Sequence, residues 1–392
     1  MQLWGGDVKY AIGHRSQLIV IFFSQLMSWI ALQSISPVLP LYIRFLGFSI
    51  ADLGTISAFL GLALIIFEPL WGLLINTLGA EKIFTLSVLM SALIAFSYTF
   101  VRDFTGFILL RFLSGISASA SGVSTRTLAC QAIPKTEKAF GVWYAIFSAA
   151  GLIGPAIGGY TANMDYNLAF YMSAFIAAIA LFSSIGITKS EGDKLNRKFS
   201  DANISKTERE TLLITATLII LPIFLRYVYQ TFMPVFARER LLLSPLEIGL
   251  VFTVMGVVGF FAPLIFGEIS NKLGLKKIII SGMLLLALAF LLLPNATDIV
   301  MLCASAIVLG FGNAAVGPPM MSLLTGNIRL SNRGIAIGVY GAGEDIGILI
   351  GPLIVGYFYQ AYSPELSFYL TAGLMLINTA FSTFLLRRFS PS

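Results

Sequence analysis

Long apolar stretches alternate with short polar segments along the whole chain. Crossing the roughly 30 Å hydrocarbon core of a bilayer takes about 20 helical residues, and twelve stretches reach that length. They cover residues 17–43, 53–75, 82–100, 104–128, 139–160, 166–187, 211–236, 246–270, 277–294, 298–324, 334–358 and 364–386. Because these stretches lack the alternating polarity of barrel strands, the pattern predicts an all-α integral membrane protein with twelve transmembrane helices.

One polar segment interrupts this pattern near the middle of the chain. Residues 189–209 contain ten charged residues together with Gly, Asn and Ser, a composition typical of a linker. The segment separates the first six apolar stretches from the last six. We therefore expect two pseudo-symmetric six-helix bundles, at residues 1–188 and 210–392, joined by a linker at 189–209.

The basic residues are distributed unevenly between the two predicted sides of the membrane. With a cytoplasmic N-terminus, 19 of the 25 Lys and Arg residues fall on the cytoplasmic side and 4 on the other. This asymmetry follows the positive-inside rule and predicts that both termini and the linker are cytoplasmic. It accounts for the net charge of +6 without a nucleic-acid partner. We expect a multi-pass protein of the inner (plasma) membrane, embedded in the lipid bilayer.

Composition argues against several classes of protein. Charged residues make up only 11% of the chain, against about 25% in soluble domains. One His and two Cys are too few for a His/Cys metal site or a disulfide framework. The phosphate-binding sequence Gly-x4-Gly-Lys-Ser/Thr does not occur. We therefore expect no enzyme activity, cofactor or metal, and a chain that works as a monomer.

The two predicted bundles resemble each other in sequence. Residues 54–83 match residues 249–278 at eight of thirty positions, and residues 141–159 match residues 338–356 at nine of nineteen. Many shared residues are Gly or Pro, which set backbone geometry. Two related six-helix units in one membrane chain are typical of transporters whose substrate site lies between the halves near the bilayer midplane.

Two loop motifs connect this repeat to a known family. The chain reads Gly72-x3-Asn76-Thr77-x-Gly79-x-Glu81-Lys82 after the second stretch and Gly267-x3-Asn271-Lys272-x-Gly274-x-Lys276-Lys277 after the eighth. Both resemble the Gly-x3-Asp-Arg/Lys-x-Gly-x-Arg/Lys-Arg/Lys signature of the major facilitator superfamily. In that family the Asp is thought to latch the two halves on the cytoplasmic side, so the neutral Asn76 and Asn271 imply a softer latch here.

Glycine-rich motifs in the fifth and eleventh stretches narrow the resemblance. The fifth carries Gly154-Pro155-x2-Gly158-Gly159 and the eleventh carries Gly351-Pro352. The first is similar to the helix-five motif of the twelve-helix drug:proton antiporters, which implies an exporter. Small residues permit close helix contact and Pro kinks a helix. We expect a sliding helix interface at the boundary between the halves, with tight static packing as the alternative.

Ionisable residues inside the predicted spans are the candidates for proton coupling, because a charge in hydrocarbon needs a partner or water. Glu344 and Asp345 lie about ten residues into the eleventh stretch, roughly halfway across the bilayer. Two adjacent carboxyl groups in a low dielectric cannot both ionise cheaply, which suits a proton carrier. In the alternative, one acid forms a structural ion pair with Arg226 while the other faces water.

Three further charged residues inside the predicted spans are candidates. Arg226, deep in the seventh, is interpreted as the counter-ion of Glu344 and Asp345, with contact to an anionic substrate as the alternative. Arg111 resembles the helix-four Arg of the family, which implies a part in proton transfer; a structural cap to backbone carbonyls is the alternative. Glu68 lies near the cytoplasmic end of the second stretch, where its side chain can reach water. A part in proton coupling is its second interpretation.

Polar and aromatic side chains near the midplane are candidates for the substrate cavity. They are Gln25, Trp29 and Gln33 in the first stretch, Tyr227 and Gln230 in the seventh, and Tyr340 in the eleventh. The first stretch has no acidic residue, so the coupling acid is expected in the C-terminal half.

These features together predict a secondary transporter that exports a small amphipathic or drug-like compound in exchange for protons by alternating access. An importer or facilitator of a small metabolite is the alternative within the same fold. A membrane sensor without transport activity is a third possibility, although a linker of about twenty residues offers no large domain for signalling.

Overall fold

The computed structural model describes residues 5–132, 136–187, 204–329 and 332–388. Within these ranges the ordered elements are helices, and twelve helical segments are long and apolar enough to cross a membrane. The prediction of an all-α membrane protein with twelve spans is confirmed. The first span consists of two helices, because the chain is interrupted at Pro37.

The helices of the first half are α1 (Gly5–Ile35), α2 (Val38–Phe45), α3 (Ile50–Leu78), α4 (Ala80–Ser97), α5 (Phe104–Ala132), α6 (Thr136–Met164) and α7 (Tyr166–Ile185). Those of the second half are α8 (Lys206–Arg240), α9 (Pro245–Leu273), α10 (Leu275–Leu292), α11 (Ile299–Gly326), α12 (Arg333–Ala361) and α13 (Pro364–Leu385). Two short 3-10 turns, η1 (Leu293–Asn295) and η3 (Leu386–Arg388), follow α10 and α13.

Most predicted boundaries agree with the helices to within a few residues, with differences at α1 and α8. Helix α8 begins at Lys206, inside the predicted linker, because Ser205 caps it. The Ser205 amide donates to Oε2 of Glu208 at 2.9 Å, and the Glu208 amide donates back to the Ser205 hydroxyl at 3.3 Å. Most of the predicted linker, up to residue 203, lies outside the described residues.

The internal repeat is visible in the helix ends. Ser49 forms a capping box at the start of α3, and Ser244 forms one at the start of α9. Gly79 and Gly274 end the same two helices with φ values of 89° and 83°, a conformation that is costly for residues with a Cβ. Positions 195 residues apart in the sequence therefore adopt the same local structure.

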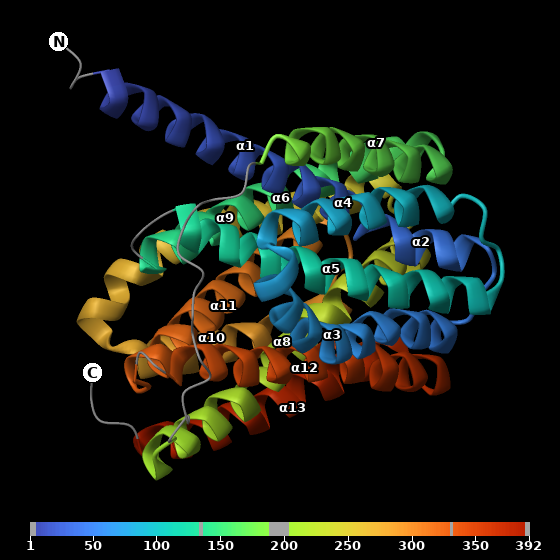
Figure 1. Ribbon diagram of the computed structural model, residues 1–392. Helices are drawn as coiled ribbons and strands as arrows, with labels where there is room; N and C mark the ends of the chain where they lie inside the picture. The colour runs from blue at the N-terminus through green and yellow to red at the C-terminus, as the bar shows by residue number, and fades with distance from the viewer. Residues whose placement is uncertain (1–4, 133–135, 188–203, 330–331, 389–392) are drawn as a thin grey trace.

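The helices form two bundles that lie against each other (Figure 1). Helix α3 packs against α12 and α6 packs against α9, so each of these pairs joins one half to the other. The starts of α1 and α8 and the ends of α7 and α13 lie at one end of the molecule, on the left in Figure 1. We call this end the linker side and the opposite end the far side.

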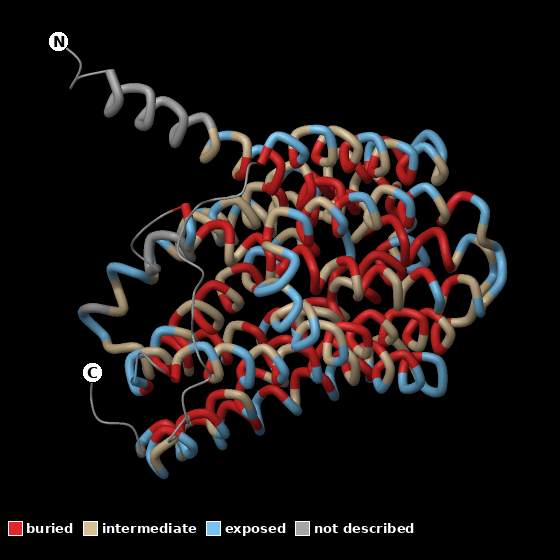
Figure 2. Tube along the Cα trace, in the orientation of Figure 1, coloured by how far each residue is buried: buried red, intermediate tan, exposed pale blue. Residues whose placement is uncertain are grey.

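Burial follows the requirements of a lipid environment rather than those of water. Figure 2 shows buried residues between the helices and exposed residues along the outer faces. Large apolar side chains, among them Phe175, Phe182 and Leu264, are exposed. In a soluble domain such a surface would cause aggregation, whereas lipid tails solvate it without penalty.

The halves touch most closely on the far side. A Cβ atom at Gly159 in α6 would lie 2.9 Å from the Cα of Gly249 in α9. In the second pair, a Cβ at Gly356 in α12 would lie 3.0 Å from the Cα of Gly54 in α3. By contrast, a Cβ at Gly267, near the linker-side end of α9, would meet no atom within 4 Å. The far side is therefore closed by backbone contacts that the linker side lacks at this position.

An ion pair also joins the halves on the far side. Arg44 in α2 donates from Nε and Nη2 to Oε1 of Glu239 in α8, at 2.8 and 2.6 Å. Beside it, the backbone amide of Ala51 donates to Oε1 of Gln360 at 2.8 Å. Arg44 and Glu239 are 195 residues apart, the spacing of the repeat, so the pair links equivalent positions of the two halves.

Reversing one charge of this pair is expected to open the far side. Arg44→Glu and Glu239→Arg each bring like charges together, whereas the double variant restores the pair. Both side chains are partly exposed, at 29% and 43%, so the pair stabilises the closed far side by about 1 kcal/mol. This corresponds to about a fivefold change in the population of the closed conformation. The measurement is the labelling rate of Gln33→Cys, a position between the halves, by an impermeant thiol reagent.

The labelling requires a background in which Cys130 and Cys303 are replaced by Ser, and the reagent is added from the far side. Both single variants should label faster than the parent, and the double variant should label at the parent rate. Equal rates in all four proteins would show that the ion pair does not hold the halves together.

Candidate functional site

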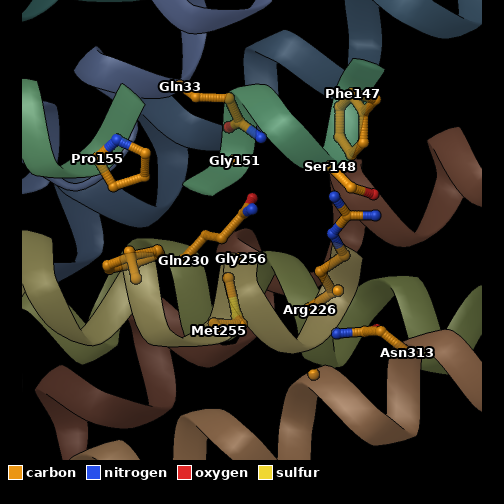
Figure 3. A pocket seen from close by; sticks show the side chains of 13 residues that line it. Gln33, Phe147, Ser148, Gly151, Pro155, Arg226, Gln230, Met255, Gly256 and Asn313 are labelled. Atoms are coloured by element: carbon orange, nitrogen blue, oxygen red, sulfur yellow. The ribbon is translucent and has the colours of Figure 1, made fainter. Parts of the chain in front are cut away.

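A cavity lies between the two halves. Its wall comes from α1 and α6 of the first half and from α8, α9 and α11 of the second. The lining residues are Gln33, Phe147, Ser148, Gly151, Pro155, Arg226, Gln230, Phe252, Met255, Gly256, Gly259, Gly310 and Asn313. Figure 3 shows the Gln33 and Gln230 side chains entering from opposite walls and Arg226 extending toward Ser148.

Two of the six predicted cavity residues, Gln33 and Gln230, line this space. The other four are not among the lining residues of this cavity. They are Gln25, Trp29, Tyr227 and Tyr340.

Three of these four side chains are buried in helix packing. Gln25 is fully buried, with neither amide atom hydrogen-bonded in the described part of the chain. Trp29 packs edge-on against Phe147, with 4.9 Å between ring centroids. Tyr340 is 1% exposed and belongs to the main apolar core. A polar residue on an apolar helix therefore did not by itself identify the face that meets the cavity.

Arg226 supplies the only charged side chain of the cavity wall among the described residues. Its Cζ lies 5.5 Å from the centroid of the Phe147 ring, a cation–π distance. The ion pairs formed between described residues do not include Arg226. The predicted ion pair between Arg226 and the acids Glu344 and Asp345 is therefore absent from this structure.

The acids of α12 instead face a basic residue of the other half. Glu68 in α3 pairs with Arg126 in α5, with 2.5 Å between Oε1 and Nη2. Arg126 also donates from Nε to the Gly122 carbonyl at 2.9 Å and lies over the ring of Trp143, 5.6 Å from its centroid. Asp345 is only 6% exposed, and the charge of Glu68 acts on its carboxyl group.

We call Glu68, Arg126, Glu344 and Asp345 the acid cluster. The charges of Arg126 and Glu68 act on Glu344 more strongly than the charge of Arg226 does. Neighbouring carboxyl groups in a low dielectric cannot both ionise cheaply. Since α3 and α12 belong to different halves, the cluster spans the interface between the halves.

Arg111 in α5 lies in the interior near two tyrosines. Its charge acts on Tyr98, whose hydroxyl is hydrogen-bonded to Ser114 at 3.2 Å, and on Tyr227 together with that of Arg226. Its Nε is buried without a hydrogen-bond partner in the described part of the chain. Within the described part of the chain Arg111 donates no hydrogen bond to a backbone carbonyl, so the structural-cap interpretation has no contact to support it.

The glycine motifs of α6 and α12 are divided between two contacts. A Cβ at Gly154 would meet Ile30 in α1 at 2.8 Å, and one at Gly158 would also meet α1. In the same way, a Cβ at Gly351 would meet Phe224 in α8 at 3.0 Å. These three glycines therefore pack within their own halves, and their predicted place at the boundary between the halves is wrong in this structure.

The neighbouring motif residues do lie at that boundary. The Pro155 carbonyl is the nearest atom to a Cβ at Gly249, and Gly159 contacts the same helix, α9. Likewise, the Pro352 carbonyl is the nearest atom to a Cβ at Gly54 in α3. In α6, the helix face that carries Pro155 and Gly159 meets the other half. The adjacent face, which carries Gly154 and Gly158, packs within its own bundle.

The loop motifs lie at the linker-side ends of α3 and α9. Gly72 and Gly267 have no atom within 4 Å of an added Cβ, and Asn76 and Lys272 are exposed. The side chain of Asn271 lies outside the described residues. Gly79 and Gly274 make the two equivalent turns described above. In this conformation the motifs do not latch the halves through Gly72, Asn76 or Lys272.

Sequence reasoning missed two polar residues that the fold brings to these sites. Arg126 was counted with the basic residues of the cytoplasmic side, although it lies within a predicted span. Asn313 lines the cavity from α11. It is an isolated amide in an apolar stretch, and this feature of the sequence could have indicated a cavity residue. The partner of each residue comes from another helix, which single-helix patterns do not specify.

The family model described as "Major Facilitator Superfamily" matches residues 21–241 and 215–392. The chain is 25% identical over 373 residues to the quinolone resistance protein NorA of Staphylococcus aureus (strain Mu50 / ATCC 700699), covering 92% of this chain and 94% of the relative. It is 22% identical over 370 residues to multidrug resistance protein 2 of Bacillus subtilis (strain 168), covering 90% and 91%.

Solved structures with the same fold include a POT family transporter in complex with 5-aminolevulinic acid, with a TM-score of 0.80 and 13% identity over 95% of this chain and 96% of that one. A bacterial homolog of the human lysosomal transporter Spinster, inward-facing and occupied, gives a TM-score of 0.74 and 13% identity over 97% and 99% of the two chains.

Proposed function

The chain belongs to the major facilitator superfamily of membrane transporters, and from this premise we propose that it is a proton-coupled exporter of a small amphipathic compound. The relatives named for quinolone and multidrug resistance support an exporter. As a transporter of this family the chain is not an enzyme, and its substrate crosses the membrane unchanged. Export proceeds by alternating access, in which the central cavity opens to one side at a time.

The observation that carries the proposal is the buried Asp345 of α12, which lies across the interface from α3 with its Glu68–Arg126 ion pair and is acted on by the charge of Glu68. A charge in the membrane interior costs about 2.5–3.5 kcal/mol on insertion scales, so a proton bound to the acid cluster lowers this cost. When the proton leaves, Arg126 is already paired with Glu68 and compensates part of the negative charge. Protonation therefore changes the free energy of the interface, which is what couples a proton to a conformational equilibrium.

The proton needs a path to water in at least one conformation. Glu68 and Arg126 keep 23% and 29% of their side-chain surface exposed, and Gly72, one turn beyond Glu68, is not covered by another helix. The far side, in contrast, is closed by the contacts of Gly159 and Gly356. In the conformation described here the proton is released toward the linker side.

We assign the linker side to the cytoplasm of a cell whose plasma membrane holds the protein. The distribution of Lys and Arg supports this orientation, and it makes the present conformation inward-facing. Proton release to the cytoplasm then accompanies substrate entry from the cytoplasm, as export by antiport requires.

The orientation predicts which reagents reach the linker. Ser200→Cys, in a background with Ser at Cys130 and Cys303, should resist an impermeant thiol reagent added to intact cells and react after the membrane is made permeable. A far-side position, Phe100→Cys, serves as the matched control because Phe100 is 66% exposed beside the helix end; it should react in intact cells. Labelling of Ser200→Cys in intact cells would reverse the orientation.

The proposed function is tested with purified protein in proteoliposomes under an imposed pH gradient. The probes are tetraphenylphosphonium, 1-naphthoate and glucose, which represent lipophilic cations, amphipathic carboxylates and sugars. We expect accumulation of an amphipathic probe that a protonophore abolishes, with glucose excluded. Transport that is indifferent to the pH gradient would favour a facilitator, and no transport of any probe in the presence of the gradient would contradict the proposal.

A further inference from the structure

Arg226 lies in the wall of a membrane cavity and forms no ion pair with another described residue. Its guanidinium faces the ring of Phe147, and the cavity is otherwise lined by neutral side chains. Figure 3 shows the group directed into the space near Ser148. An aromatic face offsets part of the desolvation of a guanidinium, but a carboxylate or phosphate is the partner that matches its paired N–H groups.

The acids of the membrane interior do not supply that partner. Glu68 is paired with Arg126, and the charge of Glu68 acts on Asp345. The charge of Arg226 acts on Glu344 less strongly than the charges of Arg126 and Glu68 do. The negative groups are therefore gathered around Arg126, and Arg226 is left to the cavity.

A second cation reinforces this separation of charge. Arg111 belongs to the first half and Arg226 to the second, and both act electrostatically on Tyr227. No ion pair between described residues involves Arg111. The two arginines act on Tyr227 more strongly than Asp345 and Glu344 do, so the charges nearest this part of the space favour an anion over a cation.

We propose that the cavity binds amphipathic organic anions, with the anionic group of the ligand held by Arg226. Amide groups of Gln33, Gln230 and Asn313 line the same space and donate further hydrogen bonds to the anionic head or to polar substituents. Phe147 and Met255 give the apolar body of the ligand a surface.

This inference rests on the proposed function, since it names the substrate class of the same transporter. It also has a consequence for energetics. Exchange of one exported monoanion for one imported proton moves two positive charges inward per cycle, so the membrane potential drives it twice as strongly as it drives a proton alone.

Binding to the purified protein tests the inference without any gradient. The probes share one ring system: 1-naphthoate is the anion, 1-naphthamide its neutral analogue, and 1-naphthylmethylammonium the cation. We expect 1-naphthoate to bind at least tenfold more tightly than either of the others. Arg226→Gln should weaken 1-naphthoate at least tenfold and leave 1-naphthamide unchanged, whereas Arg226→Lys should retain part of the preference.

Arg240→Gln is the matched control, because Arg240 lies on the same helix, is exposed, and is far from the cavity lining. It should bind all three probes as the parent does. If Arg226→Gln is poorly folded, Arg226→Lys and the analogue series in the parent protein still decide the question. Equal or tighter binding of the cation by the parent, or an unchanged anion preference in Arg226→Gln, would overturn the inference.

These outcomes are distinguishable from failure of the proposed function. A protein that prefers the cation and still accumulates it under a pH gradient is a proton-coupled exporter with a different substrate class. A protein that binds 1-naphthoate through Arg226 and ignores the pH gradient is an anion transporter without proton coupling.

Discussion

Replacing Asp345 by Asn is expected to abolish substrate accumulation driven by a pH gradient while leaving substrate binding intact. Asp345 is 6% exposed, and the charge of Glu68 in the other half acts on it. An amide of the same shape does not titrate, so the interface no longer depends on a proton at this position. Uphill transport should fall at least tenfold, and exchange of substrate down its own gradient should survive.

Glu68→Gln and Glu344→Gln separate the contributions within the acid cluster. Glu68→Gln removes the carboxyl group of the other half and should have the same effect as Asp345→Asn. Glu365→Gln is the control, because Glu365 is also a carboxylate of the second half but forms an exposed ion pair with Arg240 at 3.5 Å. It should accumulate substrate normally. Full accumulation in Asp345→Asn, Glu344→Gln and their combination would show that the proton does not travel through α12.

The second large effect is expected at Gly159. A Cβ there would lie 2.6 Å from the Pro245 carbonyl and 2.9 Å from the Cα of Gly249, and backbone atoms cannot rotate out of the way. Overpacking of this kind costs about 1–3 kcal/mol, a population change of about 5- to 150-fold. Gly159→Leu should therefore disfavour closure of the far side, reduce transport by at least tenfold and raise far-side labelling of Gln33→Cys.

Gly373→Leu provides the control for bulk. Gly373 lies in α13, and a Cβ there meets no atom within 4 Å, so the same side chain should be tolerated with normal transport and labelling. If Gly159→Leu transports at the parent rate, or if it loses transport without any rise in far-side labelling, the contact between α6 and α9 does not have to close and reopen.

The sequence predicted the helices well, because each span is specified by its own composition. Loop residues such as Gly79 and Gly274 fixed the equivalence of the halves for the same reason, since a turn with positive φ is a local requirement. The side-chain partners were predicted less well. Arg226 was paired with the acids of α12 only because all three lie at a similar depth in the membrane. Successive residues of a helix point about 100° apart, so depth does not show which face of the helix a side chain is on.

The direction in which each residue points around its helix also explains why the glycines of α6 do not all lie at the same contact. Gly154, Gly158 and Gly159 were treated as one small face, but consecutive residues on a helix point in different directions. In the structure Gly158 meets α1 and Gly159 meets α9. Which of two adjacent small residues lies at the moving interface depends on the arrangement of the neighbouring helices, which a pattern within one helix does not contain.

The most direct test of proton coupling is to follow the protons themselves. Parent protein and Asp345→Asn are reconstituted with a pH-sensitive dye inside the vesicles, and 1-naphthoate or tetraphenylphosphonium is added as the substrate probe. If transport is coupled, entry of a probe through the parent is exchanged for exit of protons and raises the internal pH. Asp345→Asn should move the probe downhill without this rise in pH. Movement of either probe through the parent without any proton movement, under conditions where the dye reports an imposed pH step, would contradict the account.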